Sequence, residues 1–128
     1  MAAFTHDDLL ARIVAAFPEL ADDIAACSGM PTLQAAALGD RLQRAKGQAD
    51  WDAYARGIQL VADLWDNADD QLARELRWSF IKALDFDGVR GPVAWEYLPP
   101  DMQRAWSLTR KYLDELSALP RKARKRRR

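Results

Sequence analysis

The amino-acid sequence predicts an all-α protein that forms a single compact domain of five to six helices, with a central helix at about 51–66. Leu and Ala together contribute 39 of the 128 residues, whereas Val and Ile contribute 8. Because β-branched side chains lose rotamer freedom in helices, this ratio favours helices over strands. Apolar residues also recur at helical spacing in four segments. Since 49% of the residues are apolar and the length suits one domain, we expect one helical domain over residues 1–120.

The N-terminal part of the sequence predicts two helices. The first begins after Thr5, because Thr5 and Asp8 have the spacing of a capping box. Its apolar stripe is interrupted at Pro18, which cannot continue a helix. A short second helix follows and ends at Gly29, since Gly readily adopts the left-handed conformation that closes helices.

A third helix is predicted over about 33–46, and Thr32 has the side chain of a helix cap. Gly39 weakens this prediction, because Gly costs about 1 kcal/mol more than Ala in a helix interior. The residues expected to face inward are Leu33, Leu38 and Leu42.

The clearest helical segment, 51–66, begins after Asp50 and carries apolar side chains on two nearly opposite faces. A helix of this kind is usually covered on both sides, so we place it at the centre of the fold. After a tight acidic turn, Asp69 or Asp70 caps a further helix at 70–84.

Trp78 departs from the buried stripe of helix 70–84 and points to its polar face, one turn from Arg74 and from Lys82. Trp and Arg are enriched at protein interfaces, so Trp78 is a candidate anchor for a partner protein. The alternative is that the segment 86–98 folds back over the ring.

Residues 85–100 break the helical pattern with two Gly, three Pro and two Asp, which is typical of a loop. The aromatic side chains of this segment predict that it packs on the domain, with at most one short strand pair near 89–97. A final helix is predicted at 100–118. Its inward side is expected to carry Met102, Ala105, Trp106, Thr109, Tyr112, Leu113 and Leu116.

The formal net charge of zero conceals an uneven distribution. Residues 121–128 contain seven basic side chains and no acid, which leaves the remaining 120 residues with a net charge of −7. We expect this C-terminal segment to be a disordered basic tail that attracts polyanions without sequence preference. The alternative is that this segment only increases the solubility of the protein. The cations of the tail are Arg121, Lys122, Arg124, Lys125, Arg126, Arg127 and Arg128.

Several classes of protein are disfavoured by what the sequence contains. A single Cys rules out an internal disulfide, and a single His rules out a His-rich metal site. The motifs of nucleophilic, metal-dependent and nucleotide-binding enzymes do not occur. We therefore predict no catalytic residue, no metal and no cofactor. The acidic start of the chain is unlike a signal peptide and no apolar run reaches membrane-spanning length, so we expect a cytoplasmic protein without a membrane span.

Acidic residues dominate the stretches 50–70 and 85–101. An acidic surface repels nucleic acid and steers association with a basic protein. We therefore predict a partner-binding site on this side of the protein, with a merely solvated surface as the alternative. Its residues are Asp66, Asp69, Asp70, Trp78, Asp85 and Asp87.

The segment 54–84, with Asp69-Asp70, Ser79-Phe80 and Leu84, resembles a family of small helical bacterial proteins of unknown function. The segment 98–116 is similar to the closing helix of that family. Several such proteins look like immunity proteins of polymorphic toxin systems, which neutralise a neighbouring toxin. The resemblance implies no catalytic residue.

The function expected from these observations is a non-catalytic protein-binding module, most simply an immunity-type inhibitor. Its acidic helical surface would occlude a basic site of a partner toxin. The alternative is a small nucleic-acid-associated protein that binds through the tail at 121–128.

Overall fold

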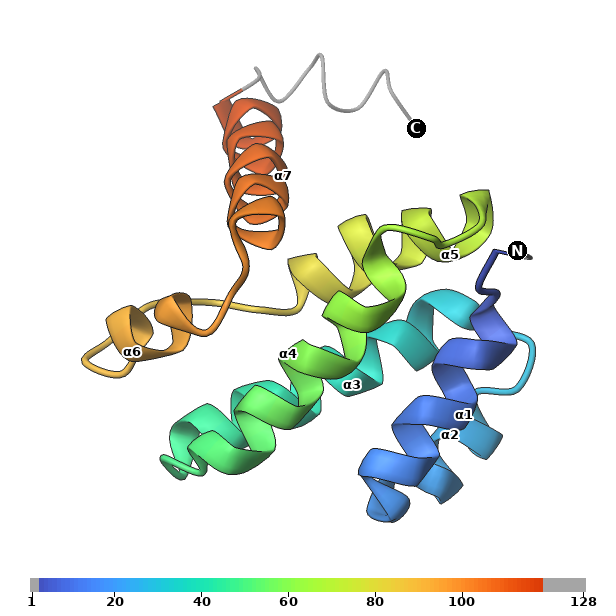
Figure 1. Ribbon diagram of the computed structural model, residues 1–128. Coiled ribbons are helices and arrows are strands. Elements are labelled where there is room, and N and C mark those ends of the chain that lie inside the picture. Colours follow the sequence, from blue (N-terminus) through green and yellow to red (C-terminus); the bar gives the residue numbers. More distant parts are fainter. Residues whose placement is uncertain (1–2, 119–128) are drawn as a thin grey trace.

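The computed structural model describes residues 3–118, and this part of the chain is all-helical, as predicted (Figure 1). Its only pairing of β type is an isolated bridge between Phe4 and Ala68. The described residues form seven α-helices rather than five or six, together with one 3-10 turn and one π-helical segment. The additional helices are short, and short helices leave little periodicity to read in a sequence.

The N-terminal helices are α1 (His6–Ala16) and α2 (Ala21–Ala26), separated by the 3-10 turn η1 (Pro18–Leu20). The predicted capping box is present, because the Thr5 backbone N–H donates to Asp8 Oδ2 at 2.8 Å and the Asp8 N–H donates to Thr5 Oγ1 at 3.4 Å. These bonds satisfy two backbone donors at the helix start and explain why α1 begins at this point.

The long helices α3 (Pro31–Gly47) and α4 (Trp51–Trp65) pack against each other and form the middle of the molecule. The Asp50 side chain accepts a hydrogen bond from Ala53 N at 3.2 Å and so caps α4, as predicted. The prediction of Thr32 as the cap of α3 was wrong: α3 begins at Pro31, whose missing N–H suits a first helical turn. Leu33 is 51% exposed instead of facing inward.

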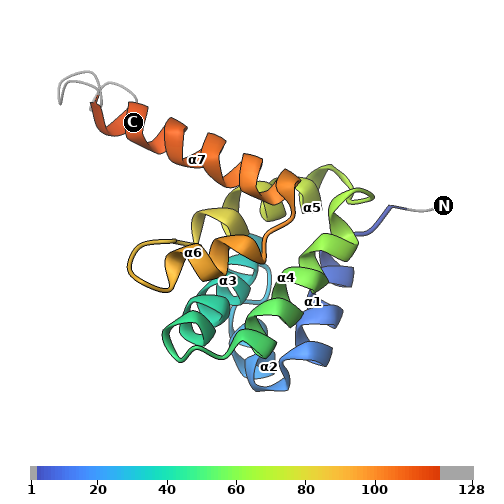
Figure 2. The same cartoon turned by 60° about the vertical axis from the view of Figure 1, so that its left-hand side comes forward.

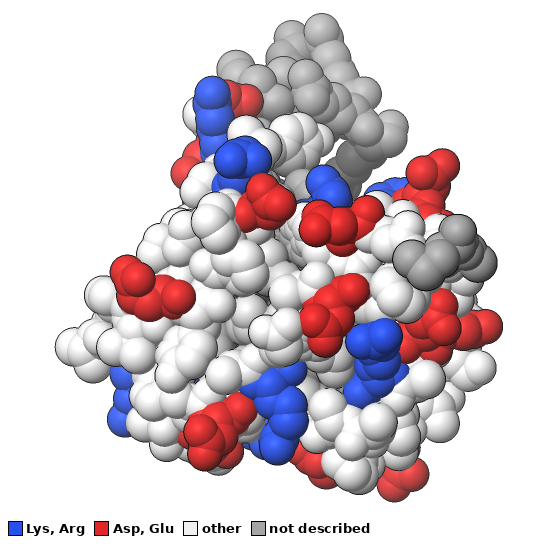
Figure 3. All heavy atoms as spheres, in the orientation of Figure 1, with Lys and Arg blue, Asp and Glu red and all other residues white. Residues whose placement is uncertain are grey.

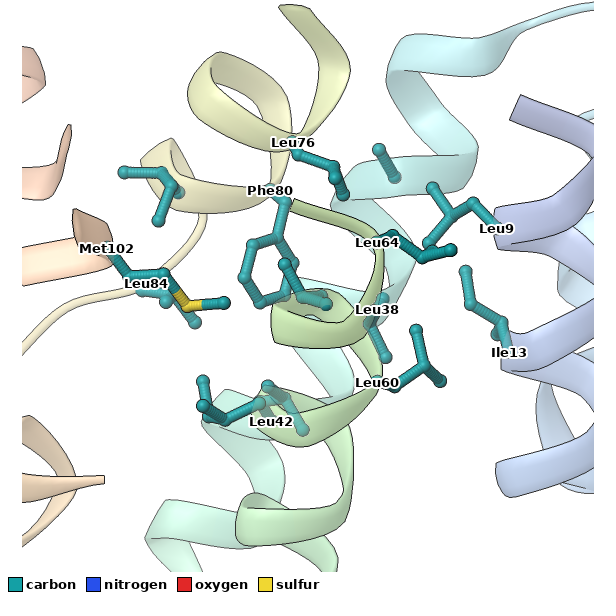
Figure 4. Packing of buried hydrophobic residues seen from close by; sticks show 14 of the residues in the cluster. Leu9, Ile13, Leu38, Leu42, Leu60, Leu64, Leu76, Phe80, Leu84 and Met102 are labelled. Carbon is teal, nitrogen blue, oxygen red and sulfur yellow. The ribbon is translucent and has the colours of Figure 1, made fainter. Parts of the chain in front are cut away.

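Helix α4 is covered on two sides, as its apolar pattern predicted. Figure 4 shows Leu60 and Leu64 beside Leu9 and Ile13 of α1, while other core side chains gather on the opposite side of α4. The side chains on that opposite side come from later elements and include Phe80, Leu84 and Met102.

The helix predicted at 70–84 begins as α5 (Asp70–Arg74) and continues through the π-helical segment η2 (Glu75–Phe80). The π-helical hydrogen-bonding pattern widens the turn and changes where successive side chains point. Glu75 and Ser79 are buried within η2, and Ser79 Oγ donates to Glu75 Oε2 at 3.0 Å.

The segment 85–100 contains the helix α6 (Gly91–Glu96), so the prediction of a loop was wrong there. No strand pair forms in this segment, which agrees with the prediction of at most one. Pro92 stands in the first turn of α6, where its missing N–H costs nothing. The expectation that the segment packs is confirmed by edge-on contacts of Phe86 with Trp95 at 5.0 Å and with Trp106 at 5.2 Å.

The last helix, α7 (Pro100–Ala118), has the predicted bounds and extends away from the rest of the molecule (Figures 1 and 2). Met102 and Thr109 are buried, so its first half packs on the body. Its second half carries the exposed Tyr112, at 49%, which corrects the prediction that this side chain faces inward. Tyr112 lies ten residues after Met102, about 80° away around the helix at 3.6 residues per turn, and therefore at the edge of the predicted inward side.

Candidate functional site

The turn between α4 and α5 is held in place by the N-terminal segment of the chain. The Phe4 backbone N–H donates to the Asn67 carbonyl oxygen at 2.8 Å, and the Asp69 N–H donates to the Phe4 carbonyl oxygen at 2.8 Å. Two backbone hydrogen bonds on either side of the turn restrict its conformations. Side chains at this turn are therefore presented in a defined geometry.

The three acidic residues predicted at this turn have different environments. Asp69 caps α5, because its Oδ1 accepts from Leu72 N at 2.8 Å. Asp66 and Asp70 are exposed and form no ion pair with any residue in 3–118. Asp69 therefore has a structural role, while the carboxylates of Asp66 and Asp70 are exposed and have no ion-pair partner among the described residues.

Asp66 stands at the edge of a pocket of about 380 Å³ between the end of α4, the segment η2 and the first half of α7. Within this pocket, the Arg77 guanidinium carbon lies 4.9 Å from the centroid of the Trp65 ring. Asp101 accepts a hydrogen bond from Arg104 Nη1 at 3.3 Å. The lining residues are Trp65, Asp66, Arg77, Asp101, Arg104, Ala105, Leu108 and Thr109.

The charge of this region is mixed rather than uniformly acidic. Two Asp and two Arg line the pocket, and Figure 3 shows acidic and basic side chains interspersed over the face of the molecule that it draws. The prediction of an acidic partner-binding surface is therefore narrowed to the acidic residues of the α4–α5 turn. The sequence reasoning missed Arg77 and Arg104 as neighbours of Asp66, because η2 and α7 meet α4 only in the tertiary structure.

Trp78 lies in η2, outside the pocket that contains Asp66. Its half-buried ring meets Tyr112 of α7 edge-on, with the ring centroids 5.6 Å apart, and Lys82 Nζ lies 5.4 Å from the ring centroid. The ring is thus flanked by α7 and by Lys82. It also borders a second, smaller pocket of about 260 Å³, lined by Thr32, Ala36, Trp78, Ser79, Lys82 and Ala83.

Asp85 and Asp87 follow the far end of the helix that begins at Asp70. A helical stretch over 70–82 spans about 20 Å at 1.5 Å per residue, so the predicted acidic residues fall into two separate groups. The Asp85 Oδ1 accepts from Lys46 Nζ at 2.8 Å. This hydrogen bond lowers the pKa of the Asp85 carboxyl below its usual value, and burial opposes the shift.

The buried Tyr54 lies near this ion pair, and its hydroxyl group makes no hydrogen bond to any described residue. Burial raises the pKa of the Tyr54 phenol, and the negative charge of Asp85 raises it further. The phenol is therefore held in its neutral form, which makes it a poor nucleophile. Tyr54 acts as a core residue that packs against the rings of Trp51 and Tyr97.

Within residues 3–118, no three His, Cys, Asp or Glu side chains gather in a way that could hold a metal ion. The single His donates from Nε2 to Gln34 Oε1 over 2.9 Å, because the Gln34 amide nitrogen is itself a donor to the Ile24 carbonyl oxygen. The helices of this part of the chain are also too short or too polar to cross a membrane.

Residues 10–113 match the model of a protein family described as "Domain of unknown function (DUF7674)". The chain belongs to this family. No curated protein and no solved structure matches the chain. The DUF7674 match covers the elements that form both pockets and the α4–α5 turn, and it ends before the basic residues 121–128, which lie outside the described residues.

Proposed function

We propose that the protein is a non-catalytic protein-binding module that acts as an immunity-type inhibitor of a partner toxin. The observation that supports this most directly is the pair of exposed carboxylates, Asp66 and Asp70, without cation partners among the described residues. They flank a turn fixed by backbone hydrogen bonds to Phe4, beside a pocket with a Trp side chain in its wall.

This arrangement suits recognition of a basic protein surface. Unpaired carboxylates speed association with a basic partner, and the rigid turn reduces the conformational entropy lost on binding. The pocket offers Leu108, which is 62% exposed, as an apolar contact that slows dissociation once water is excluded, whereas Trp65 in the same pocket is buried. Occlusion of a basic active site would follow from binding alone, so no chemical step is required of this chain.

The proposed surface differs from the one inferred from the sequence. The proposed surface retains Asp66 and Asp70 as charged contacts. The Asp69 side chain instead caps the start of α5. Asp85 is left out because it pairs with Lys46 at the other end of the helix. Trp78 is left out because it borders a different pocket.

The test uses the protein encoded beside this chain in its genome as the partner. Co-expression should yield a complex and should relieve any toxicity of that neighbour. The double substitution Asp66→Lys/Asp70→Lys should reduce the association rate strongly, with the loss greatest at low salt, since it reverses two steering charges.

The matched control for this experiment is Asp22→Lys/Asp23→Lys on α2, which reverses two exposed acids far from the α4–α5 turn (Figures 1 and 2). The control should bind like the natural protein. A neighbour that does not bind, or binding that both double variants affect equally, would refute the proposal.

A second candidate function is non-specific binding of nucleic acid through residues 121–128. The seven cations in that segment support it, because each cation that contacts a phosphate releases bound counterions. The acidic turn opposes it, since Asp66 and Asp70 would repel a polyanion. The two functions are separable, because they rest on different parts of the chain.

A further inference from the structure

Two side chains in the wall of the pocket between α4, η2 and α7 carry polar groups without a partner. Trp65 is 6% exposed and Thr109 is 8% exposed, and both line this pocket of about 380 Å³. Within residues 3–118, neither the Trp65 indole N–H nor the Thr109 hydroxyl makes a hydrogen bond. Unlike the enclosed hydroxyl of Tyr54, these two groups are not shut off from solvent, so they are reached from the pocket that both side chains line.

The same pocket contains one cation and one anion that are not paired. Arg77 and Asp66 are exposed, and neither forms an ion pair in the described part of the chain. The other two charged side chains of the pocket, Asp101 and Arg104, pair with each other at 3.3 Å. The Arg77 guanidinium lies over the Trp65 ring, with 4.9 Å between its carbon and the ring centroid. A guanidinium over an aromatic ring keeps N–H groups at its edge that suit a planar carboxylate.

We infer that this pocket binds a free α-amino acid with an apolar side chain. The carboxylate of the ligand accepts hydrogen bonds from Arg77, from the Trp65 N–H and from the Thr109 hydroxyl, which are the donors that lack a partner. The ammonium group of the ligand lies toward the Asp66 carboxylate. Its side chain contacts Leu108, the exposed apolar residue of the pocket.

A ligand with both charges fits this pocket better than a ligand with one. A simple carboxylic acid would meet the like charge of Asp66, and a simple amine would meet the like charge of Arg77. An amino acid satisfies both side chains and leaves the pair of Asp101 with Arg104 intact. The volume of the pocket lies near the lower end of the range of ligand sites, about 300–1,000 Å³, which suits a small molecule.

An NMR titration of the full chain with L-leucine tests the inference, followed at the indole N–H signal of Trp65. This signal should shift saturably as the N–H gains an acceptor. The indole N–H of Trp106 already donates to the Leu84 carbonyl oxygen at 3.1 Å, so its signal should stay in place. L-Leucinamide lacks the carboxylate and 4-methylpentanoate lacks the ammonium group. Each should bind at least about tenfold more weakly than L-leucine, because each loses a hydrogen-bonded charge.

Variants assign each end of the ligand to its partner. Arg77→Gln should weaken L-leucine at least about tenfold and leave the affinity for L-leucinamide unchanged. Asp66→Asn should weaken L-leucine and should not weaken 4-methylpentanoate. Thr109→Val keeps the shape of the side chain and should weaken L-leucine about fivefold through loss of one hydrogen bond. Arg74→Gln, an exposed arginine that does not line the pocket, is the matched control and should bind like the natural protein.

The titration needs no partner protein, so its failure is distinct from failure of the proposed function. A Trp65 signal that does not shift saturably would overturn the inference. So would L-leucine that binds no more tightly than L-leucinamide or 4-methylpentanoate. Equal losses for Arg74→Gln and Arg77→Gln would also overturn it, since they would show a general effect of charge rather than a contact in the pocket.

Discussion

Gly39 of α3 faces Ala83 so closely that a Cβ atom at position 39 would lie 2.5 Å from the Cβ of Ala83. The same atom would lie 3.1 Å from the carbonyl oxygen of Phe80. The glycine that weakens the helix locally is thus what allows α3 to approach η2. Ala83 also lines the pocket beside Trp78, so this contact lies next to that pocket.

Gly39→Ala should therefore destabilise the protein in spite of the better helix propensity of Ala. Overpacking a tight contact costs about 1–3 kcal/mol, whereas the propensity gain is at most about 1 kcal/mol. Gly47→Ala is the matched control in the same helix, since no atom lies within 4 Å of a Cβ at that position. Urea denaturation should show a lower free energy of unfolding for Gly39→Ala and no decrease for Gly47→Ala. Equal effects of the two substitutions would contradict the close approach of α3 to Ala83.

Asp69→Ala should cost about 0.5–2 kcal/mol of unfolding free energy, because it removes the side chain that caps α5. Asp70→Ala removes a carboxylate one residue later that makes no such bond, so its effect should stay within about 0.5 kcal/mol. Thermal or urea unfolding compares the two variants. Equal stability losses would mean that the two carboxylates do not have the separate roles described.

The ion pair of Lys46 with Asp85 should make stability depend on acid pH. The pKa of Asp85 is lowered in the folded protein by its hydrogen bond from Lys46, so the fold favours the charged carboxylate. The stabilisation is complete above the pKa of an unfolded Asp, about 3.9, and is lost as the pH falls through the lower folded value. The free energy of unfolding of the natural protein should therefore exceed that of Asp85→Asn by less as the pH falls below about 4.

The cause of this pH effect is tested with Lys46→Met, which removes the cation and keeps a long side chain. The NMR titration midpoint of the Asp85 carboxyl should rise toward the ordinary range in this variant. Lys111→Met, an exposed position on α7, is the control and should leave the midpoint unchanged. A midpoint that does not respond to Lys46→Met would assign the shift to another group.

Removal of residues 121–128 should abolish binding of random-sequence duplex DNA and leave the helical circular dichroism signal unchanged. With the full chain, log affinity should fall with log salt concentration by about 0.9 for each phosphate contacted. Titrations of both chains at two salt concentrations measure this. Binding that survives the truncation would place the nucleic-acid contact on the helical body instead.

Local features of the sequence determined where several helices begin. Thr5, Asp50 and Asp69 each cap a helix with their own side chain, and such bonds reach only two or three residues along the chain. The apolar period of 51–66 likewise determined that the central helix is covered on two sides, since side chains three and four positions apart must share a face.

The tertiary structure alone decided how these helices meet. Lys82 lies beside the Trp78 ring, as the spacing predicted, although the segment is π-helical. The contact of that ring with Tyr112 could not be read from the sequence, because α7 meets η2 only in the tertiary structure. The pairing of Lys46 with Asp85, and of Trp78 with Tyr112, joins residues more than thirty positions apart. Helical spacing orders residues around one helix, but the distances between helices depend on packing, and packing decides which charges remain free to bind a partner.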